Sequence, residues 1–165
     1  MGGFSKLVLT IGIPGSGKTR WVEKYKKTHP LVFVISTDDL REELTGVRQC
    51  DPTQSEWIHE EARKRAKEVM DHPDDYGFKH TLGPTIIIDS TNVDVSEWIK
   101  YKNLGCTLMS ARLFDVTVDK AMENQTKRER QVPRFVLEDK YQTLQRNKKY
   151  MPYFFNFIYT KGKDF

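Results

Sequence analysis

Residues 12–19 read Gly-Ile-Pro-Gly-Ser-Gly-Lys-Thr and follow directly on the mostly apolar run 6–11, Lys-Leu-Val-Leu-Thr-Ile. Glycine and proline are unfavourable inside helices and strands, so this stretch predicts a turn between a buried strand and a helix within residues 16–27. The pattern Gly-x4-Gly-Lys-Thr in that setting is typical of a phosphate-binding loop. A glycine-rich turn without a ligand is the alternative, and the match of the whole pattern argues against it.

Each residue type in this loop suits the binding of a nucleoside triphosphate. Glycine has no Cβ, so successive backbone N–H groups can point at phosphates, and a helix N-terminus adds partial positive charge. Lys18 is predicted to reach the β- and γ-phosphates, and the Thr19 hydroxyl to ligate Mg²⁺. The loop residues predicted to bind ATP are Gly12, Pro14, Gly15, Ser16, Gly17, Lys18 and Thr19. ATP is therefore the expected phosphate donor and Mg²⁺ the expected cofactor.

Length and composition predict one globular domain over residues 1–165. Hydrophobic residues make up 38% of the chain and charged residues 30%, and no apolar run approaches the roughly 20 residues that cross a bilayer. The two cysteines have no metal or redox spacing, which favours reduced thiols in a cytoplasmic protein without membrane contact. The net charge of +4 is a mild indication of an anionic partner, and nothing in the sequence specifies an oligomeric state.

Strand-like and helix-like segments alternate along the chain. The predicted strands are 6–11, 31–35, 85–89, 107–115 and 154–160. The predicted helices are 16–27, 36–45, 53–70, 116–125 and 133–149. This alternation predicts an α/β fold of the P-loop NTPase class and small-kinase type, with a five-stranded, mainly parallel sheet and helices on both faces.

The segment 53–70 has apolar residues at helical spacing, which predicts one face on the core. The residues assigned to that face are Trp57, Ile58, Ala62, Ala66, Val69 and Met70. Arg63, Lys64 and Lys67 are predicted to face away from the core.

A second candidate group of functional residues follows the second strand, in Ile-Ser-Thr-Asp-Asp-Leu-Arg at 35–41. Asp38 and Arg41 are three residues apart and would share one face of a short helix. A carboxylate could orient and deprotonate an acceptor hydroxyl, and a cation could hold the acceptor's own phosphate. The spacing is equally compatible with acids that stabilise a helix N-terminus and an arginine on the surface.

Two further segments carry candidate site residues. Asp89 ends the apolar run 85–89, where an acid can hold Mg²⁺ together with Thr19; capping of the next turn is the alternative. Residues 124–134 are basic and lie between two predicted helices, as a short lid that could close over ATP would. A solvated basic turn is the alternative there.

Several motifs occur in an order that resembles the polynucleotide 5′-hydroxyl kinase family of P-loop kinases. These motifs are the phosphate loop at 12–19, Ser-Thr-Asp-Asp-Leu-Arg at 36–41, Ile-Ile-Ile-Asp-Ser-Thr-Asn at 86–92, Phe-Asp-Val at 114–116 and Lys-Arg-Glu-Arg-Gln-Val-Pro at 127–133. The resemblance spans residues 6–158. It does not extend to a phosphatase, because the chain has no Asp-x-Asp motif.

The resemblance implies a role for each matching residue. Asp38 is implied as the general base, Arg41 as the contact to the phosphate 3′ of the target hydroxyl, and Arg128 as the lid arginine on the ATP phosphates. The family's second lid arginine is replaced here by Asn124, and Arg130 is the residue that could compensate.

The expected activity is transfer of the ATP γ-phosphate to the 5′-hydroxyl of RNA or DNA ends, as in nucleic-acid repair, with Lys18, Asp38 and Arg128 as catalytic residues. Nucleic acid is then the partner and substrate. A small-molecule or nucleotide-sugar kinase of the zeta-toxin type shares the Ser-Thr-Asp-Asp-Leu-Arg and Asp-Ser-Thr-Asn layout and is the second hypothesis. A non-catalytic ATP-binding regulator is the third.

Overall fold

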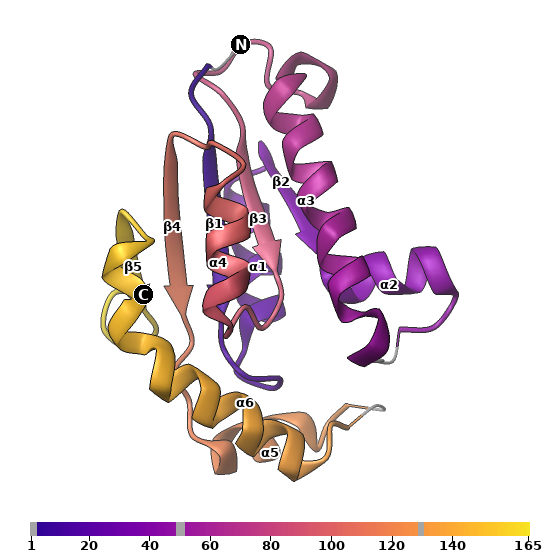
Figure 1. The fold of residues 1–165 in the computed structure, drawn as a ribbon, viewed down its shortest axis with the longest axis vertical. Coiled ribbons are helices and arrows are strands. Elements are labelled where there is room, and N and C mark those ends of the chain that lie inside the picture. Colours follow the sequence, from indigo (N-terminus) through magenta and orange to yellow (C-terminus); the bar gives the residue numbers. More distant parts are fainter. Residues whose placement is uncertain (1–2, 49–51, 129–130) are drawn as a thin grey trace.

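A computed structural model describes residues 3–48, 52–128 and 131–165 of the chain (Figure 1). The strands are β1 (Lys6–Ile11), β2 (Val32–Ser36), β3 (Thr85–Asp89), β4 (Leu108–Leu113) and β5 (Phe157–Thr160). The α-helices are α1 (Lys18–Thr28), α2 (Thr37–Thr45), α3 (Ser55–Asp71), α4 (Val95–Lys102), α5 (Val118–Gln125) and α6 (Arg134–Asn147). Short 3₁₀ helices are η1 (Pro52–Gln54), η2 (Pro73–Tyr76) and η3 (Lys148–Tyr153). Within the described ranges, no helix is both long enough and apolar enough to cross a membrane.

The five strands form one sheet in the order β2-β3-β1-β4-β5, and every pairing is parallel. The predicted α/β fold with a five-stranded sheet is confirmed, and the sheet is wholly rather than mainly parallel. Because β1 is central, the loop that follows it opens in the middle of the edge formed by the carboxyl ends of the strands. Ligands of open parallel sheets bind outside that edge.

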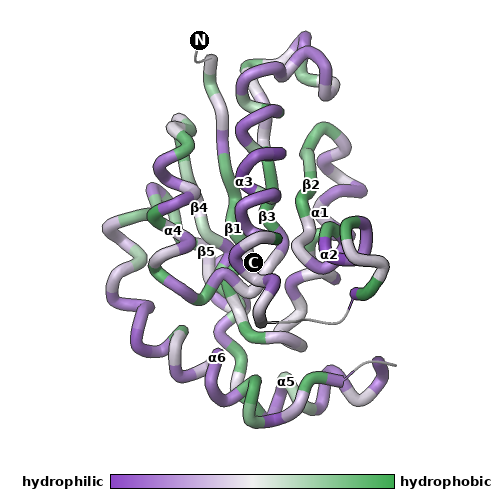
Figure 2. Tube along the Cα trace, turned by 45° about the vertical axis from the view of Figure 1, so that its right-hand side comes forward, coloured by the Kyte–Doolittle hydropathy of each residue, from purple (hydrophilic) through white to green (hydrophobic). Residues whose placement is uncertain are grey.

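Alternating side chains of the central strands fill two separate cores. Leu7, Leu9 and Ile11 of β1 join the larger core with residues of α3 and α4. Val8 of β1 points to the opposite face and packs with Val22 of α1. Successive residues of a strand point to opposite faces, so helices must cover both sides of the sheet. Figure 2 shows this arrangement, with hydrophobic strands inside and a largely hydrophilic α3 outside.

Two helical units flank the carboxyl edge of the sheet (Figure 1). On one side is α2, which begins where predicted because the Ser36 side chain accepts a hydrogen bond from the Asp39 backbone N–H. Across the end of the sheet lie α5 and α6, which pack on each other through a small core around Ile13 and Leu137. The α2 unit and the α5–α6 unit, which are far apart in the sequence, therefore both lie at the edge where the phosphate loop opens.

The structure differs from the sequence-based expectations at α3 and α4. Helix α4 was not predicted, although Trp98 and Tyr101 on it are fully buried. Trp57 was predicted on the core face of α3, but it is 47% exposed. The buried residues of that helix include Ile58. Neighbouring residues in a helix are about 100° apart around its axis, so Trp57 lies to the side of the core. Arg63 was predicted to face away and instead pairs with Glu97 of α4.

Asn92 holds together the ends of β1 and β3. Its side-chain amide donates hydrogen bonds to the Thr10 and Ile88 backbone oxygens at 2.8 and 3.2 Å. Its own backbone oxygen accepts one from the Trp98 indole at 2.6 Å. Asn92 is buried and has a φ of 46°, a left-handed conformation that asparagine tolerates better than most residues. The turn after Asp89 is therefore tied to both strands and to α4.

We expect Asn92→Ala to lower the free energy of unfolding by about 1–3 kcal/mol, because two buried carbonyl groups lose a donor. Urea denaturation followed by circular dichroism measures the change. Asn103→Ala is the matched control, since Asn103 is exposed at the end of α4 and should have little effect. Equal denaturation midpoints for Asn92→Ala and the unmodified protein would contradict the assigned role of Asn92.

Candidate active site

A cavity of about 470 Å³ opens at the carboxyl edge of the sheet. A volume of this size suits a small-molecule ligand or one nucleotide unit. The cavity is lined by the phosphate loop, the start of α2, the turn after β3, the first half of α3 and the lid. The predicted site residues on its wall are Pro14, Gly15, Gly17, Lys18, Thr19, Asp38, Arg41, Asp89 and Arg128. Residues more than 100 positions apart in the sequence thus meet at one place.

The phosphate loop is held from behind by close packing. Gly15 has a φ of 84°, and a Cβ on it would lie 2.6 Å from the Ala121 backbone oxygen of α5. A Cβ on Gly12 would lie 2.9 Å from the Phe114 backbone oxygen. Gly12 and Ser16 are buried behind the loop and do not form part of the cavity wall. Glycine is therefore required here both for the loop conformation and for the approach of neighbouring segments.

Lys18 lies at the start of α1 and is almost completely buried. Its Nζ donates hydrogen bonds to the Ile13 backbone oxygen at 2.8 Å and to Ser16 Oγ at 3.4 Å. Burial lowers the pKa of Lys18 to about 8, and the nearby carboxylates of Asp89 and Asp38 oppose that shift. No acidic residue lies in the first turn of α1, so the partial positive charge of the helix N-terminus is not offset locally.

Thr19 and Asp89 present adjacent oxygen atoms at the edge of the cavity. Thr19 Oγ1 donates a hydrogen bond to Asp89 Oδ2 at 3.1 Å. Burial raises the pKa of Asp89, while the Lys18 charge and the Thr19 hydrogen bond favour its ionised form. Hydroxyl and carboxylate oxygens are the ligand types that Mg²⁺ prefers, so this pair fits the predicted metal. Among the described residues, no group of three or more His, Cys, Asp or Glu side chains could hold a metal ion.

Asp38 and Arg41 lie on the same side of α2, as their spacing predicts. Arg41 Nη1 donates to Asp38 Oδ1 at 2.9 Å. Only 6% of the Arg41 side chain is exposed, against 48% of the Asp38 side chain. Within the described ranges, Arg41 Nε is a buried donor without a hydrogen-bond partner. The surface alternative for Arg41 is therefore wrong, and its side chain forms part of the cavity wall.

The segment predicted to be a lid, residues 124–134, contacts the phosphate loop at the end of α5. Asn124 donates a hydrogen bond to the Gly15 backbone oxygen at 2.9 Å. The buried amide of Gln125 both donates to and accepts from the Val132 backbone, which closes the segment between them. Arg128 lies in that segment and lines the cavity, and its charge acts to lower the pKa of Lys18. Arg130, the other predicted ATP contact, lies outside the described residues.

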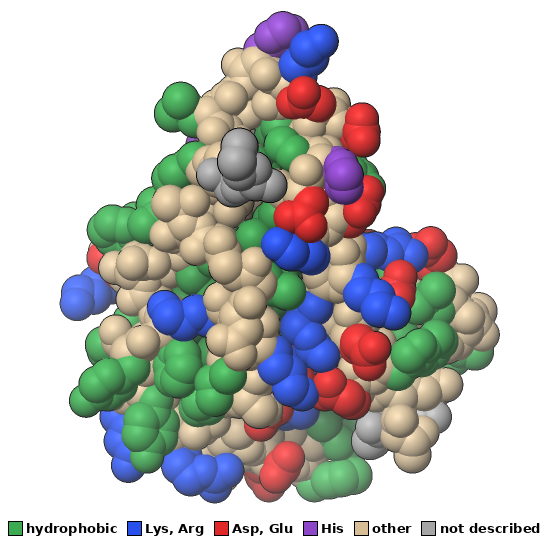
Figure 3. All heavy atoms as spheres, turned by 45° about the horizontal axis from the view of Figure 1, so that its top comes forward, with side chains coloured by type: hydrophobic (Ala, Val, Ile, Leu, Met, Phe, Trp, Pro, Cys, Tyr) green, Lys and Arg blue, Asp and Glu red, His purple; other side chains and the backbone are tan. Residues whose placement is uncertain are grey.

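In the described part of the chain, three basic side chains of the region 120–149 form ion pairs with acids. Arg134 contacts Asp119 and Glu138, and Lys148 contacts Asp115. On the face shown in Figure 3, a group of Lys and Arg side chains near the centre lies beside Asp and Glu side chains. Part of the positive charge of this region is therefore offset by neighbouring acids. Lys140 of α6, by contrast, lines the cavity with Arg128.

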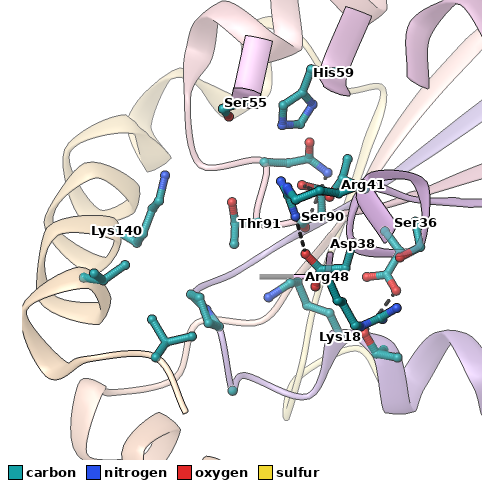
Figure 4. A pocket seen from close by; sticks show the side chains of 18 of the residues that line it. Lys18, Ser36, Asp38, Arg41, Arg48, Ser55, His59, Ser90, Thr91 and Lys140 are labelled. Atoms are coloured by element: carbon teal, nitrogen blue, oxygen red, sulfur yellow. Dashed lines mark hydrogen bonds and ion pairs between the residues drawn. The ribbon is translucent and has the colours of Figure 1, made fainter. Parts of the chain in front are cut away.

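Sequence reasoning missed a polar group at the far end of the cavity (Figure 4). His59 of α3 and Glu97 of α4 both line the cavity, and His59 Nδ1 lies 3.4 Å from Glu97 Oε2. Arg63 Nη1 donates to the same carboxylate at 3.1 Å. Burial and the Arg63 charge lower the pKa of His59 to about 4, so its ring is neutral near pH 7. In the sequence, His59 lies next to apolar residues of α3, and nothing local marks it as a site residue. Its place in the cavity becomes evident only once α4, which was not predicted, is packed beside α3.

A family model described as an AAA domain (AAA_33) matches residues 7–147. The chain belongs to this family. It has a kinase-like P-loop domain, and the resemblance predicted from the motifs is confirmed at the level of the fold. One chain in a structure of the Pnkp1/Rnl/Hen1 RNA repair complex superposes with a TM-score of 0.74 at 22% identity, over 92% of this chain and 47% of that one.

Other similar proteins have varied functions. A gluconokinase from Sinorhizobium meliloti superposes with a TM-score of 0.61 at 14% identity, over 96% of this chain and 82% of that one. NEDD4-binding protein 2 from Homo sapiens is 34% identical over 99 residues, which are 60% of this chain and 5% of that protein. The chain thus spans about a twentieth of that curated relative and less than half of the repair-complex chain. These similarities identify a P-loop kinase-like fold and leave the acceptor to be inferred from the site.

We expect ATP binding to weaken as the pH rises above about 8. Lys18 has a lowered pKa, so it loses its positive charge above that pH in the nucleotide-free protein. Binding to anionic phosphates requires the charged form, so the dissociation constant should increase by up to about ten-fold for each further pH unit. Titration calorimetry from about pH 7 to about pH 9.5 measures this. Lys18→Met is the control: it should bind weakly without that dependence, and a flat profile for the unmodified protein would contradict the assignment.

Proposed function

We propose that this chain is an ATP-dependent kinase that transfers the γ-phosphate to the 5′-hydroxyl of RNA or DNA ends. In this proposal, residues 1–165 act as one kinase domain and residues 124–134 act as its lid. Lys18, Asp38 and Arg128 are the catalytic residues, and the loop residues with Arg128 and Arg130 bind ATP. Asp38 and Arg41 bind the acceptor.

The buried Arg41 is the observation that carries this proposal. A buried guanidinium is stable only with partners, and its one ion pair in the described chain is with the half-exposed Asp38. The Arg41 side chain lines the cavity (Figure 4), so an anion bound there would be a further partner for its charge. An acceptor that carries its own phosphate close to the reacting hydroxyl would supply that partner. A nucleotide with a free 5′-hydroxyl and a 3′-phosphate places the two groups on one sugar ring.

The positions of Asp38 and Lys18 suggest how transfer proceeds. The Asp38 carboxylate accepts the proton of the acceptor hydroxyl, and the hydroxyl oxygen forms a bond to the γ-phosphorus. The bond from that phosphorus to the bridging oxygen breaks, and ADP leaves. Lys18 and Arg128 place positive charge beside the transferring group, where charge stabilisation contributes most to the rate. Arg41 holds the acceptor so that its hydroxyl lies at Asp38.

Thr19 and Asp89 are the residues that would hold Mg²⁺. When bound, the ion neutralises charge on the β- and γ-phosphates. The Thr19 hydrogen bond keeps the Asp89 carboxylate turned toward the start of α1. Lys18 lies beside the same carboxylate, as its electrostatic effect on Asp89 shows. The two residues therefore present their oxygen atoms where the phosphates would lie.

The repair-complex neighbour supports a nucleic-acid acceptor, and the gluconokinase neighbour keeps a small-molecule kinase as the alternative outcome. Both similarities lie below 25% identity, so the acceptor must be tested directly. The phosphate loop and the proposed acceptor residues line one cavity, so the ATP phosphates and the end of the acceptor would meet in it.

We expect Asp38→Asn to lower kcat by about 10²–10⁴-fold, because an amide cannot accept the hydroxyl proton. Phosphate transfer from labelled ATP to a 5′-hydroxyl oligonucleotide gives kcat, and calorimetry shows whether ATP binding is retained. Asp39→Asn is the matched control, because Asp39 is exposed and, unlike Asp38, does not line the cavity. A larger loss in Asp39→Asn than in Asp38→Asn would contradict the assignment of the base.

We expect a nucleoside 3′-monophosphate to be a far better acceptor than the same nucleoside. A charge-assisted contact with Arg41 should raise kcat/KM by about 10- to 100-fold, and Arg41→Ala should remove that advantage without changing KM for ATP. Arg65→Ala is the control, because Arg65 pairs with Glu43 on the surface. Gluconate and other sugars belong in the same assay. Transfer to a sugar, with no transfer to either nucleoside compound, would replace the proposal with the small-molecule alternative.

A further inference from the structure

The far end of the cavity contains polar atoms to which the proposed mechanism assigns no role. His59 and Ser55 come from the first half of α3, and Glu97 comes from α4. In Figure 4 the ring of His59 projects from α3 toward Arg41, with Ser55 beside it. Only 12% of the His59 side chain and 10% of the Glu97 side chain are exposed. These groups are therefore part of an enclosed surface rather than of the outer face of the protein.

The surroundings of His59 select one of its two neutral forms. Nδ1 lies 3.4 Å from Glu97 Oε2 and 3.5 Å from the Tyr101 hydroxyl. The negative charge of Glu97 favours the ring form that carries its proton on Nδ1, and the Tyr101 hydroxyl then accepts the hydrogen bond from Nδ1. In this form Nε2 is a hydrogen-bond acceptor. Among the described residues, Nε2 has no hydrogen-bond partner. A ligand that hydrogen-bonds to Nε2 in this form supplies the donor.

The donor can be identified from its position relative to Arg41. If Arg41 binds the 3′-phosphate of the acceptor, the group next to His59 belongs to the same sugar. A phosphate has no proton to donate near neutral pH, whereas the 2′-hydroxyl on the adjacent ring carbon is a donor. The same hydroxyl distinguishes RNA from DNA.

We propose that His59 accepts a hydrogen bond from the 2′-hydroxyl of the acceptor's terminal ribose, so that ribonucleotide ends are preferred over deoxyribonucleotide ends. This inference rests on the proposed 5′-hydroxyl kinase function and specifies the acceptor of that reaction. Glu97 is a positioning residue, since its charge favours the His59 ring form with the proton on Nδ1. Arg63 in turn holds the Glu97 carboxylate at 3.1 Å.

The test compares acceptors that differ only at the 2′ position. Adenosine 3′-phosphate and 2′-deoxyadenosine 3′-phosphate are phosphorylated with labelled ATP, and kcat/KM is measured for each. We expect the ribonucleotide to be preferred by about three- to ten-fold, the worth of one hydrogen bond between neutral groups. The 2′-fluoro analogue, which is similar in size but cannot donate, should behave as the deoxy compound.

Variants of His59 assign the preference to this side chain. His59→Leu should reduce the ratio of the two kcat/KM values to about one, chiefly by slowing the ribonucleotide, because the acceptor nitrogen is lost. His59→Gln retains a carbonyl acceptor and should keep part of the preference. His72→Leu is the matched control, because His72 is exposed at the other end of α3. Each ratio is measured within one preparation, so a loss of folded protein affects both acceptors equally and leaves the ratio unchanged.

The outcomes separate this inference from the function on which it rests. Equal use of the two nucleotides, or a preference that persists in His59→Leu, overturns the role of His59 and leaves the kinase proposal standing. No transfer to either nucleotide overturns both. A ribonucleotide preference that is lost in His59→Leu and retained in His72→Leu supports the inference.

Discussion

Parallel pairing of β2, β3 and β1 is the constraint on which the site depends. The pairing sets Ser36 of β2 opposite Asp89 of β3, and Leu9 of β1 opposite Ile88. Strands that run in one direction end at one edge, so the segments after each strand meet there although they are distant in sequence. The backbone hydrogen bonds of the sheet therefore bring three segments together: the phosphate loop, the start of α2 and the turn after β3.

Charge compensation is the second requirement, because the site buries several ionisable groups. Lys18 and Arg41 are both buried cations, and Asp89 is a buried acid. Removing any of them from water is costly unless charges of opposite sign lie nearby. Asp89 and Asp38 supply negative charge near Lys18, and Asp38 pairs with Arg41. Groups that could bind phosphates thus also compensate one another's charge when no phosphate is bound.

The two ends of the cavity differ in how far sequence alone predicts them. At the phosphate end, residues 12–19 are contiguous and their backbone forms the site, so a local pattern is sufficient. Asp38 and Arg41 required a choice between site and surface, which their spacing could not make. The burial of Arg41 excludes a surface position for that residue, and burial depends on elements that are remote in the sequence. The end around His59 was not predicted at all.

The errors at α3 and α4 have one physical origin. The eight residues of α4 are too few to show a clear helical period, yet Trp98 and Tyr101 on it complete the core. Without that helix, the periodicity of α3 was compatible with a wide apolar face that included Trp57. The packed helix uses a narrower line of residues and gives Arg63 a partner in Glu97.

Sequence by itself determined the class of fold, the phosphate loop and the identity of the groups that could act on phosphate. Strand periodicity, turn residues and helix start signals are local, because each affects the backbone conformation of residues close to it in the sequence. Only the tertiary structure decided that Arg41 is buried beside Asp38, that Asn124 contacts the phosphate loop, and that His59 reaches the same cavity. Those facts depend on which surfaces pack together, and packing joins residues whose separation in the chain carries no signal.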